Sequence, residues 1–316
     1  MEKSLRYLVV GDINIDIIFK GIKTPPIMGQ EIFVSDMDVC LGGSAANTAS
    51  ALGKLGAHVA LWTRVAQDEF GPFLLKSLSQ AGVELRHVKQ ILGGKSGVSV
   101  AMTNHNDRSF ISFPGTNQEV DFAGVEETDL TGYTYLHLSG FDWERNFPGY
   151  LTLLQRAKRM GMITSFDLGW TEFDRHRSSF WELLPWVDYF FPNEVEALAL
   201  TQAPDLSTAL EKLGEKISVP VITLGNRGAV TKWQGQVIHQ AAFQVESIDA
   251  VGAGDAFAAG FLWATGQGMT PPEALRIANA CGALTSAGIG GGASAPSHED
   301  LFEFLNRSST KITERE

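Results

Sequence analysis

The chain has 316 residues, of which 44% are hydrophobic and 19% charged, with a formal net charge of −11 and a pI of about 5.1. This composition is typical of a globular protein with a large core, and the acidic balance argues against nucleic acid or an anionic membrane as the main partner. An anionic small ligand remains compatible with it, because such a ligand needs only a local positive potential.

The two cysteines, Cys40 and Cys281, lack the spacing of metal ligands, and we expect both to be reduced thiols. The apolar run near the N-terminus is far too short for a signal peptide core. The uncharged stretch 277–297 is too rich in Gly and Ser for a membrane-spanning helix. We therefore expect a cytoplasmic protein with neither a membrane nor a nucleic-acid partner.

Short apolar runs alternate with helical patterns along most of the chain. The predicted strands are 8–11, 58–63, 133–138, 163–167, 187–191, 219–224 and 229–233. The predicted helices are 47–55, 71–81, 150–160, about 180–184, a helix from 193, 255–265 and 272–287. Strands that alternate with helices, and that read as continuous apolar runs, indicate a parallel sheet covered on both faces. The predicted fold class is α/β, with a doubly wound, mostly parallel sheet flanked by helices in a single domain, 1–316.

Two stretches break this alternation and read as short strands, 31–39 and 97–113. His105-Asn106-Asp107 is the predicted turn between strands 98–103 and 108–113. These pieces predict a small separate sheet, from about 14–40 and 96–114, that covers the carboxyl edge of the main sheet as a lid. A small sheet with exposed edges invites pairing, so a homodimer through the lid is a further expectation.

Gly252-Ala253-Gly254-Asp255 opens a long apolar helical run. A helix N-terminus carries unpaired N–H groups that attract anions, and glycines let an anion come close to them. A carboxylate at that place suits a base that accepts a hydroxyl proton late, during attack on phosphorus. The pattern indicates a phosphoryl-transfer site, with the alternative that Asp255 is only the N-cap of its helix.

Two N-terminal stretches offer groups that suit a polyol. Gly42-Gly43-Ser44-Ala45-Ala46-Asn47 permits close approach of the backbone and supplies the Asn47 amide, although it also fits a loop before an Asn-capped helix. Asn14 and Asp16 follow the first strand, where ligands bind at the carboxyl edge of a parallel sheet. Their alternative is exposure on a face of the lid.

Two later stretches fit a nucleotide. Asn193-Glu194-Val195-Glu196 places carboxylates at a strand end, which suits a hydrated Mg²⁺, or else forms a helix cap with an acidic first turn. Thr223 to Gly228 combines a strand with a glycine turn, which suits a nucleotide pocket or a plain hairpin. The chain contains neither a GxxxxGK[ST] run nor a GxGxxG fingerprint after its first strand, which argues against a P-loop kinase and a Rossmann dehydrogenase.

Taken in this order, the five stretches resemble the ribokinase-like (PfkB) family of carbohydrate kinases, over about 7–305. The strongest matches are Gly42-Gly43-x-Ala45-x-Asn47 and Asp249-x-x-Gly252-Ala253-Gly254-Asp255. The resemblance implies ATP-dependent phosphorylation of a hydroxymethyl group on a sugar. Asp255 would be the base, and the N–H groups of Gly252, Ala253, Gly254 and Asp255 the anion hole.

The resemblance also implies positions for the ligands. The sugar would contact Asn14, Asp16, Gly42, Gly43 and Asn47. Asn193 and Glu196 would arrange Mg²⁺, with Glu196 acting through water, and ATP would contact Thr223, Gly225, Gly228 and Asn279. A monovalent cation such as K⁺ would lie near Asp249, the Val251 carbonyl, Gly290 and Ser294.

The chain departs from the family pattern at two places that bear on the acceptor. Ser44 stands where ribokinases proper carry Lys, and Asp167-Leu168-Gly169-Trp170 lacks the Asn and Arg of the family's Asp-Pro-Asn-x-Arg segment. The missing arginine argues against an acidic sugar, although Arg108 in the expected lid offers a cation for a charged substrate or is simply solvated. The alternatives are a nucleoside or other small-molecule kinase, or a sugar-sensing protein without catalysis.

Overall fold

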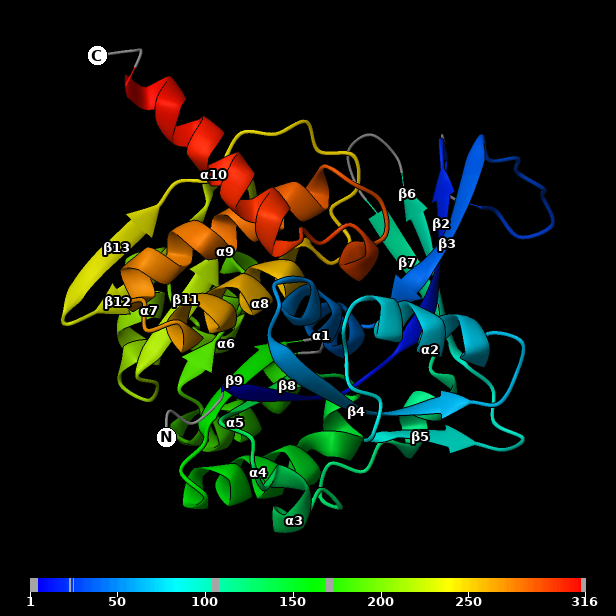
Figure 1. The fold of residues 1–316 in the computed structure, drawn as a ribbon, viewed down its shortest axis with the longest axis horizontal. Coiled ribbons are helices and arrows are strands. Elements are labelled where there is room, and N and C mark those ends of the chain that lie inside the picture. Colours follow the sequence, from blue (N-terminus) through cyan, green and yellow to red (C-terminus); the bar gives the residue numbers. More distant parts are fainter. Residues whose placement is uncertain (1–4, 23, 25, 104–107, 169–172, 314–316) are drawn as a thin grey trace.

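The computed structural model describes residues 5–22, 24, 26–103, 108–168 and 173–313. The described strands form a large sheet of nine strands and a small sheet of four, and Figure 1 shows the small sheet beside the large one, at the upper right. The large sheet has the order β13-β12-β11-β10-β9-β8-β1-β4-β5. Its pairs are parallel except β11–β12 and β12–β13. Its strands are β1 Arg6–Val10, β4 His58–Ala66, β5 Val88–Ile91, β8 Tyr135–Gly140, β9 Ile163–Leu168, β10 Tyr189–Phe190, β11 Val219–Thr223, β12 Ala229–Trp233 and β13 Gln236–Gln240.

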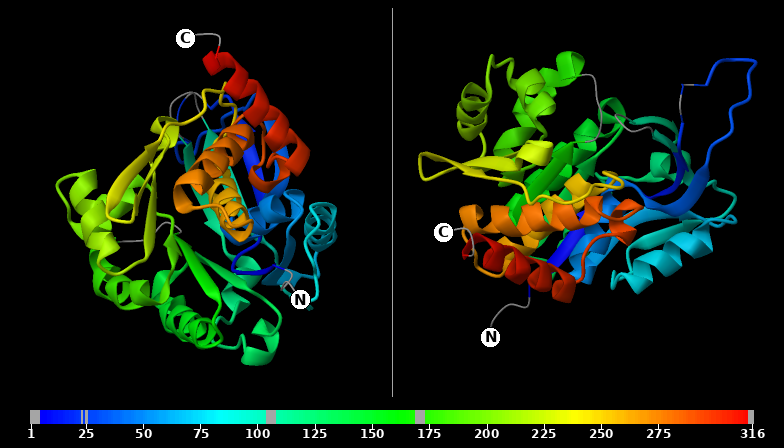
Figure 2. Two further views of the ribbon diagram at one scale, coloured as in Figure 1. Left: turned by 60° about the vertical axis from the view of Figure 1, so that its left-hand side comes forward. Right: turned by 90° about the horizontal axis from the view of Figure 1, so that it is seen from above.

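Helices cover both faces of the large sheet (Figure 2). The central strand shows why: Leu8 and Val10 pack into one hydrophobic core and Val9 into the other, because successive side chains of a strand point to opposite faces. The core of Val9 is covered by α1 Ser44–Lys54, α2 Gly71–Gln80, α8 Ala253–Gly266, α9 Pro271–Ser286 and α10 His298–Thr313. The other is covered by α3 Glu127–Leu130, α4 Trp143–Arg159, α5 Phe173–Leu183, α6 Glu194–Thr201 and α7 Leu206–Gly214. Short 3-10 turns are η1 Gly115–Glu119, η2 Leu184–Trp186, η3 Gly225–Arg227 and η4 Gly291–Ala293. The predicted doubly wound fold is confirmed.

The small sheet has the order β3-β2-β6-β7 and comes from the two segments predicted to form a lid. Its strands are β2 Asn14–Lys20, β3 Asp36–Gly42, β6 Gly97–Thr103 and β7 Arg108–Phe113. β2 pairs antiparallel with β3 and parallel with β6, and β6 pairs antiparallel with β7. The predicted turn at 105–107 lies outside the described residues.

Several predicted boundaries were wrong. Strand β3 begins at Asp36 rather than at 31, because its register with β2 places Asp36 opposite Lys20, with which it forms an ion pair. Helix α4 begins at Trp143 rather than at 150, so Pro148 lies inside it, although an interior proline removes a backbone hydrogen bond and is normally unfavourable in a helix. Helix α1 begins at Ser44 rather than at Asn47.

The order of the large sheet creates one crevice. β1 pairs with β4 on one side and with β8 on the other, so the chain winds first in one direction and then in the opposite one. In open α/β sheets, ligands bind at the carboxyl ends of the strands at such a switch point. The residues that follow β1, together with the end of β8, therefore mark the expected site.

Within the described residues, no helix combines the length and apolar character needed to cross a membrane. Both cysteines are free thiols. The cytoplasmic location and the lack of a nucleic-acid partner stay predictions.

Candidate active site

Helix α8 begins at the crevice with a glycine that no other residue can easily replace. Gly252 is its N-cap, with a φ of 71°, and a Cβ built on it would lie 2.4 Å from the Cα of Gly291. Gly254 differs, since a Cβ on it would have no heavy atom within 4 Å. Asp255 lies in the first turn of this helix. The helix therefore presents its N-terminus and one carboxylate to the crevice.

Helix α1 begins against the end of β1 and faces the same place. Gly43 has a φ of 90°, and a Cβ on it would lie 2.8 Å from the Cα of Ile13. The Asp12 carboxylate accepts a hydrogen bond from the Ala45 N–H at 3.1 Å, which caps the helix. A Cβ on Gly42 would lie 2.0 Å from Cγ of Asp16, so the Asp16 carboxylate rests on this glycine. This early capping explains why α1 begins before Asn47.

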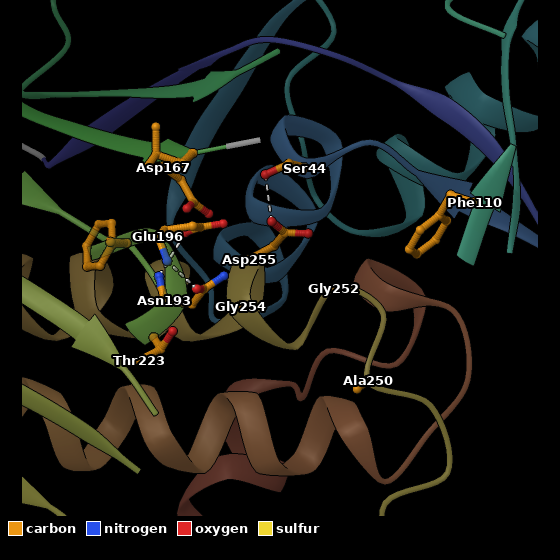
Figure 3. Close-up of a pocket in the computed structure, with 12 residues that line it drawn as sticks. Ser44, Phe110, Asp167, Asn193, Glu196, Thr223, Ala250, Gly252, Gly254 and Asp255 are labelled. Carbon is orange, nitrogen blue, oxygen red and sulfur yellow. Dashed lines mark hydrogen bonds between the residues drawn. The ribbon is translucent and has the colours of Figure 1, made fainter. Parts of the chain in front are cut away.

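The two helices meet at Asp255 (Figure 3). The Ser44 hydroxyl donates to Asp255 Oδ1 at 2.6 Å, and Asn47 Nδ2 donates to Oδ2 at 2.9 Å. Asn47 Oδ1 in turn accepts from the Gly292 N–H at 2.9 Å. Asn47, predicted to contact a sugar, therefore has its amide engaged with Asp255 and the η4 turn.

A cavity of about 370 Å³ opens in front of Asp255. Its lining comes from α1, the small sheet, β9, α6, β11 and the start of α8, as Figure 3 shows. The lining residues are Ser44, Phe110, Asp167, Leu168, Phe191, Asn193, Glu196, Thr223, Ala250, Gly252, Gly254 and Asp255. The structure thus brings Asp255, both of its glycines, Asn193, Glu196 and Thr223 to one cavity.

Carboxyl groups gather around this cavity. Burial raises the pKa of Asp167 well above its usual range, and the neighbouring Asp255 and Glu196 carboxylates raise it further. Burial raises the pKa of Glu196 to about 7, although hydrogen bonds with Asn193 oppose the shift. Burial, with Asp12 and Asp255 nearby, raises the pKa of Asp16 to about 7. Strongly shifted carboxyls in a cleft are typical of functional sites.

Asn193 and Glu196, predicted to arrange Mg²⁺, line the cavity and also stabilise their own helix. The Asn193 side chain accepts from the Glu196 N–H at 2.9 Å, and the Glu196 carboxylate accepts from the Asn193 N–H at 2.8 Å, which is a capping box. Thr223 forms a backbone bridge with Asn193. Asn193 and Glu196 therefore cap their helix, as the alternative interpretation predicted, and also line the cavity.

The other predicted nucleotide residues lie beyond the residues that line this cavity. Gly225 begins η3, and Gly228 ends it with a φ of 99°. A Cβ on Gly228 would lie 2.0 Å from the Gln240 carbonyl oxygen, and the Asn279 amide donates to that same oxygen at 2.9 Å. Gly228 and Asn279 thus both fix the segment after β13.

The predicted cation residues lie on two adjoining segments. The Asp249 carboxylate accepts from the Val251 N–H at 3.0 Å and from the Gly290 N–H at 3.1 Å. Ser294 Oγ donates to the carbonyls of Gly291 and Thr285. These bonds join Asp249, Val251 and Gly290, whereas Ser294 is linked to Gly291, the neighbour of Gly290.

Two residues predicted to contact the acceptor, Asn14 and Arg108, are not among the described residues that line the cavity. Asn14 Oδ1 accepts from Asn117 Nδ2 at 2.6 Å, and Asn117 also bonds the backbone of Ile13. Arg108 begins β7, opposite Thr103, and its side chain lies outside the described residues.

Sequence reasoning assigned no role at the site to Asn117 or Ser139. It noticed Asp12 only as part of the polar stretch 12–16 after the first strand, and it read Ser44 and Asp167 only as departures from a family. Asp12 and Ser139 carry a signal that was available, since each is a polar residue at the carboxyl end of a buried central strand. Asn117 carried none, because η1 brings it to the site from more than 100 positions away.

The chain has clear relatives. A family model described as pfkB family carbohydrate kinase matches residues 5–298. The chain belongs to the pfkB family of carbohydrate kinases. This kinase is 31% identical over 309 residues to the ATP-dependent ribose-1-phosphate kinase of Halopiger xanaduensis, covering 96% of this chain and 98% of that protein.

One further relative and one solved structure match along nearly the whole chain. The kinase is 27% identical over 318 residues to the ribokinase of Haemophilus influenzae, covering 98% of this chain and 100% of that protein. A candidate ribokinase II of E. coli, solved with ATP and Mg²⁺, has the same fold, with a TM-score of 0.85 at 23% identity over 96% of this chain and 99% of that one. The family resemblance is confirmed, and the chain is a phosphotransferase that acts on a sugar hydroxyl.

Proposed function

We propose that this kinase transfers the γ-phosphoryl group of ATP to a hydroxymethyl group of a ribose-like or ketohexose-like sugar, with Asp255 as the base. The observation that carries the proposal is the start of α8. Asp255 and the open position at Gly254 face one cavity, where N–H groups and the helix dipole favour an anion.

The chain's own residues account for the chemistry. Asp255 accepts the proton of the acceptor hydroxyl while that oxygen bonds to the γ-phosphorus and the bond to the ADP oxygen breaks. The N–H groups at the start of α8 stabilise the charge on the transferring group. The small sheet, which reaches the cavity through Phe110, covers it as a lid and excludes water.

The donor set fits Mg²⁺ and K⁺. The Asp167 and Glu196 carboxylates line the cavity, and hard oxygen donors suit Mg²⁺. Glu196 would hold the ion through water, and the ion would supply charge compensation on the phosphates of ATP. Behind α8, the oxygens of Asp249, Val251, Gly290 and Ser294 would hold K⁺. Gly225, Gly228 and Asn279 would position the adenosine part, since Gly228 and Asn279 contact the end of β13 and Gly225 begins the turn that leads to Gly228.

The acceptor is proposed to be neutral. The residues that line the cavity include three acidic side chains, those of Asp167, Glu196 and Asp255, and no Lys, Arg or His, so the described lining offers an anionic sugar no side-chain cation. Asn14, Asp16, Gly42, Gly43 and Asn47 would surround the sugar, and Arg108 of the lid would approach it.

Because one relative is named a ribose-1-phosphate kinase, the acceptor panel must include phosphorylated sugars. We would measure ADP release with pentoses, ketohexoses, ribose 1-phosphate, sugar acids and nucleosides, with and without K⁺. A clear preference for the phosphorylated sugar would overturn the neutral acceptor.

Replacing the base tests the mechanism directly. Asp255→Asn keeps the shape of the side chain. Its one carbonyl oxygen can still accept from Asn47, and its NH2 group can donate to the Ser44 hydroxyl, so the fold should persist while kcat falls at least about 100-fold. Circular dichroism and ADP release measure the two effects. Turnover close to that of the wild type in the Asn variant would sink the assignment of Asp255.

A homodimer through the small sheet is also proposed. The register places one set of side chains on the face away from Phe110, and all of these except Ser109 are apolar. The apolar ones are Ile15, Ile17, Phe19, Met37, Val39, Leu41, Val98, Val100, Met102, Ile111 and Phe113. Ile15 and Leu41 are buried against the core. Ile111 is 62% exposed and Met37 52%, and exposed apolar side chains gathered on one face indicate a protein interface. Sedimentation should show a dimer that Ile111→Asp dissociates and that Val237→Asp, equally charged but on β13, leaves intact.

A further inference from the structure

Polar side chains run from the interior of the large sheet to Asp255. At the cavity, Ser44 Oγ donates to Asp255 Oδ1 at 2.6 Å and lies 3.3 Å from Ser139 Oγ, at the end of β8. Ser139 Oγ lies 3.4 Å from Nε2 of His137 on the same strand. His137 Nδ1 lies 2.9 Å from Ser165 Oγ on β9. A continuous chain of hydrogen-bond contacts thus leads from Ser165 through His137, Ser139 and Ser44 to Asp255. The proposed mechanism does not otherwise use this chain.

The inner part of this line is fixed and uncharged. Ser139, His137 and Ser165 are at most 2% exposed. Burial lowers the pKa of His137 to about 3, so its ring is neutral and can hydrogen-bond without bringing a charge into the sheet. A buried and satisfied polar network specifies one arrangement of its members. Ser139 is therefore a fixed neighbour for the Ser44 hydroxyl.

The Ser44 hydroxyl has one proton and two acceptors. The Asp255 carboxylate is the nearer one, at 2.6 Å, and this length is typical of a hydroxyl that donates to a charged oxygen. Ser139 Oγ is the second, at 3.3 Å. Once Asp255 has taken the proton of the acceptor, its charge is gone, and the hydroxyl can turn to Ser139 rather than lose part of its hydrogen bonding.

We propose that Ser44 is a positioning residue for Asp255, which holds the carboxylate toward the acceptor hydroxyl and turns to Ser139 when Asp255 becomes neutral. The proton of Ser44 stays on Ser44 throughout. Asn47 holds the other carboxylate oxygen, so the two side chains from α1 fix the plane of the base. A base must lie within hydrogen-bond reach of the proton it accepts. The proposal rests on the function proposed above, with Asp255 as the base.

The test compares Ser44→Ala with Ser44→Thr and with Ser50→Ala. Loss of a hydrogen bond to a charged group is expected to lower kcat about 10-fold or more, while KM for the sugar and for ATP stays within about twofold of the wild type. Ser44→Thr keeps the hydroxyl and should restore most of kcat. Ser50 lies on the same helix and its buried Oγ has no hydrogen-bond partner, so Ser50→Ala should turn over like the wild type. An unchanged kcat in Ser44→Ala, or a change in KM alone, would overturn the proposal.

A double-mutant cycle tests the link to the sheet. Ser139→Ala should lower kcat by a smaller factor, about 3-fold, and should add nothing to Ser44→Ala because the link is already cut. Fully multiplicative losses would show that Ser139 does not act through Ser44. Asp255→Asn is measured in parallel. If that variant stays active, the proposed function itself fails. If it is inactive while Ser44→Ala keeps full kcat, only the positioning role fails.

Discussion

Helices α1 and α8 both begin at a glycine with a positive φ, 90° at Gly43 and 71° at Gly252, and both begin beside Asp255. In front of α1 the chain fills the space itself, because the Asp12 carboxylate caps the helix and Ile13 lies against Gly43. In front of α8, Gly254 faces the cavity, and a Cβ there would meet nothing within 4 Å. The side of Gly43 that a Cβ would occupy is thus filled by the chain, whereas the corresponding side of Gly254 is open.

The largest expected effect falls on the packed helix. Gly43→Ala combines a positive φ with a Cβ only 2.8 Å from the Cα of Ile13, so we expect a loss of about 3 kcal/mol in the free energy of unfolding. Urea denaturation measures it. Gly56→Ala is the matched control, since Gly56 has a φ of 81° with nothing within 4 Å, and it should lose only about 1 kcal/mol. Equal losses in the two variants would contradict close packing as the role of Gly43.

A smaller and pH-dependent effect is expected at Asp16, whose carboxylate rests on Gly42. Its pKa is raised to about 7 in the folded protein and is near 4 in the unfolded chain. The unfolded chain therefore loses its proton first, and stability falls as the pH rises from about 4 to 7. Asp16→Asn removes this loss, so its stability relative to wild type should rise by more than about 1 kcal/mol between pH 4 and pH 8.

Thermal melts of both proteins across this range check the prediction for Asp16. Asp36→Asn is the control on the neighbouring strand. Asp36 is exposed, and a hydrogen bond from Lys20 lowers its pKa, so its titration lies below this window. A constant difference between Asp16→Asn and wild type from pH 4 to pH 8 would contradict a buried, protonated Asp16.

The contrast between the two helices also shows what the sequence could predict. The glycines beside Asp255 were recognisable because the chemistry of a helix N-terminus is local and depends on consecutive residues. The partner of Asp255 was not, because Ser44 lies 211 positions away, and only the packing of α1 against α8 brings the two together. The cap of α1 was missed for the same reason, since Asp12 belongs to the end of another element.

The small sheet shows a second limit. The existence of its strands followed from alternating residues, but the start of β3 did not, because the pairing with β2 fixes which residues of 31–42 are in the strand. The apolar face of this sheet likewise depends on the register of four strands. A single strand shows only that it alternates, and the neighbour that it aligns with decides which side chains share a surface.

The smallest effect on stability, but a large one on activity, is expected at Gly254. Alanine favours a helix over glycine by up to about 1 kcal/mol, and a methyl group there has no atom within 4 Å apart from its own helix backbone and chain neighbours, so Gly254→Ala should fold at least as stably as the wild type. The methyl group would enter the space in front of the α8 N–H groups, where the phosphoryl group is proposed to lie. We expect kcat/KM for ATP to fall about 10-fold or more, measured by ADP release.

Gly214→Ala at the end of α7, whose added Cβ would make only an ordinary contact with Lys232, should keep full activity. If Gly254→Ala also keeps it, the open space at α8 is not the phosphoryl site, and the contrast between the two helices loses its functional meaning.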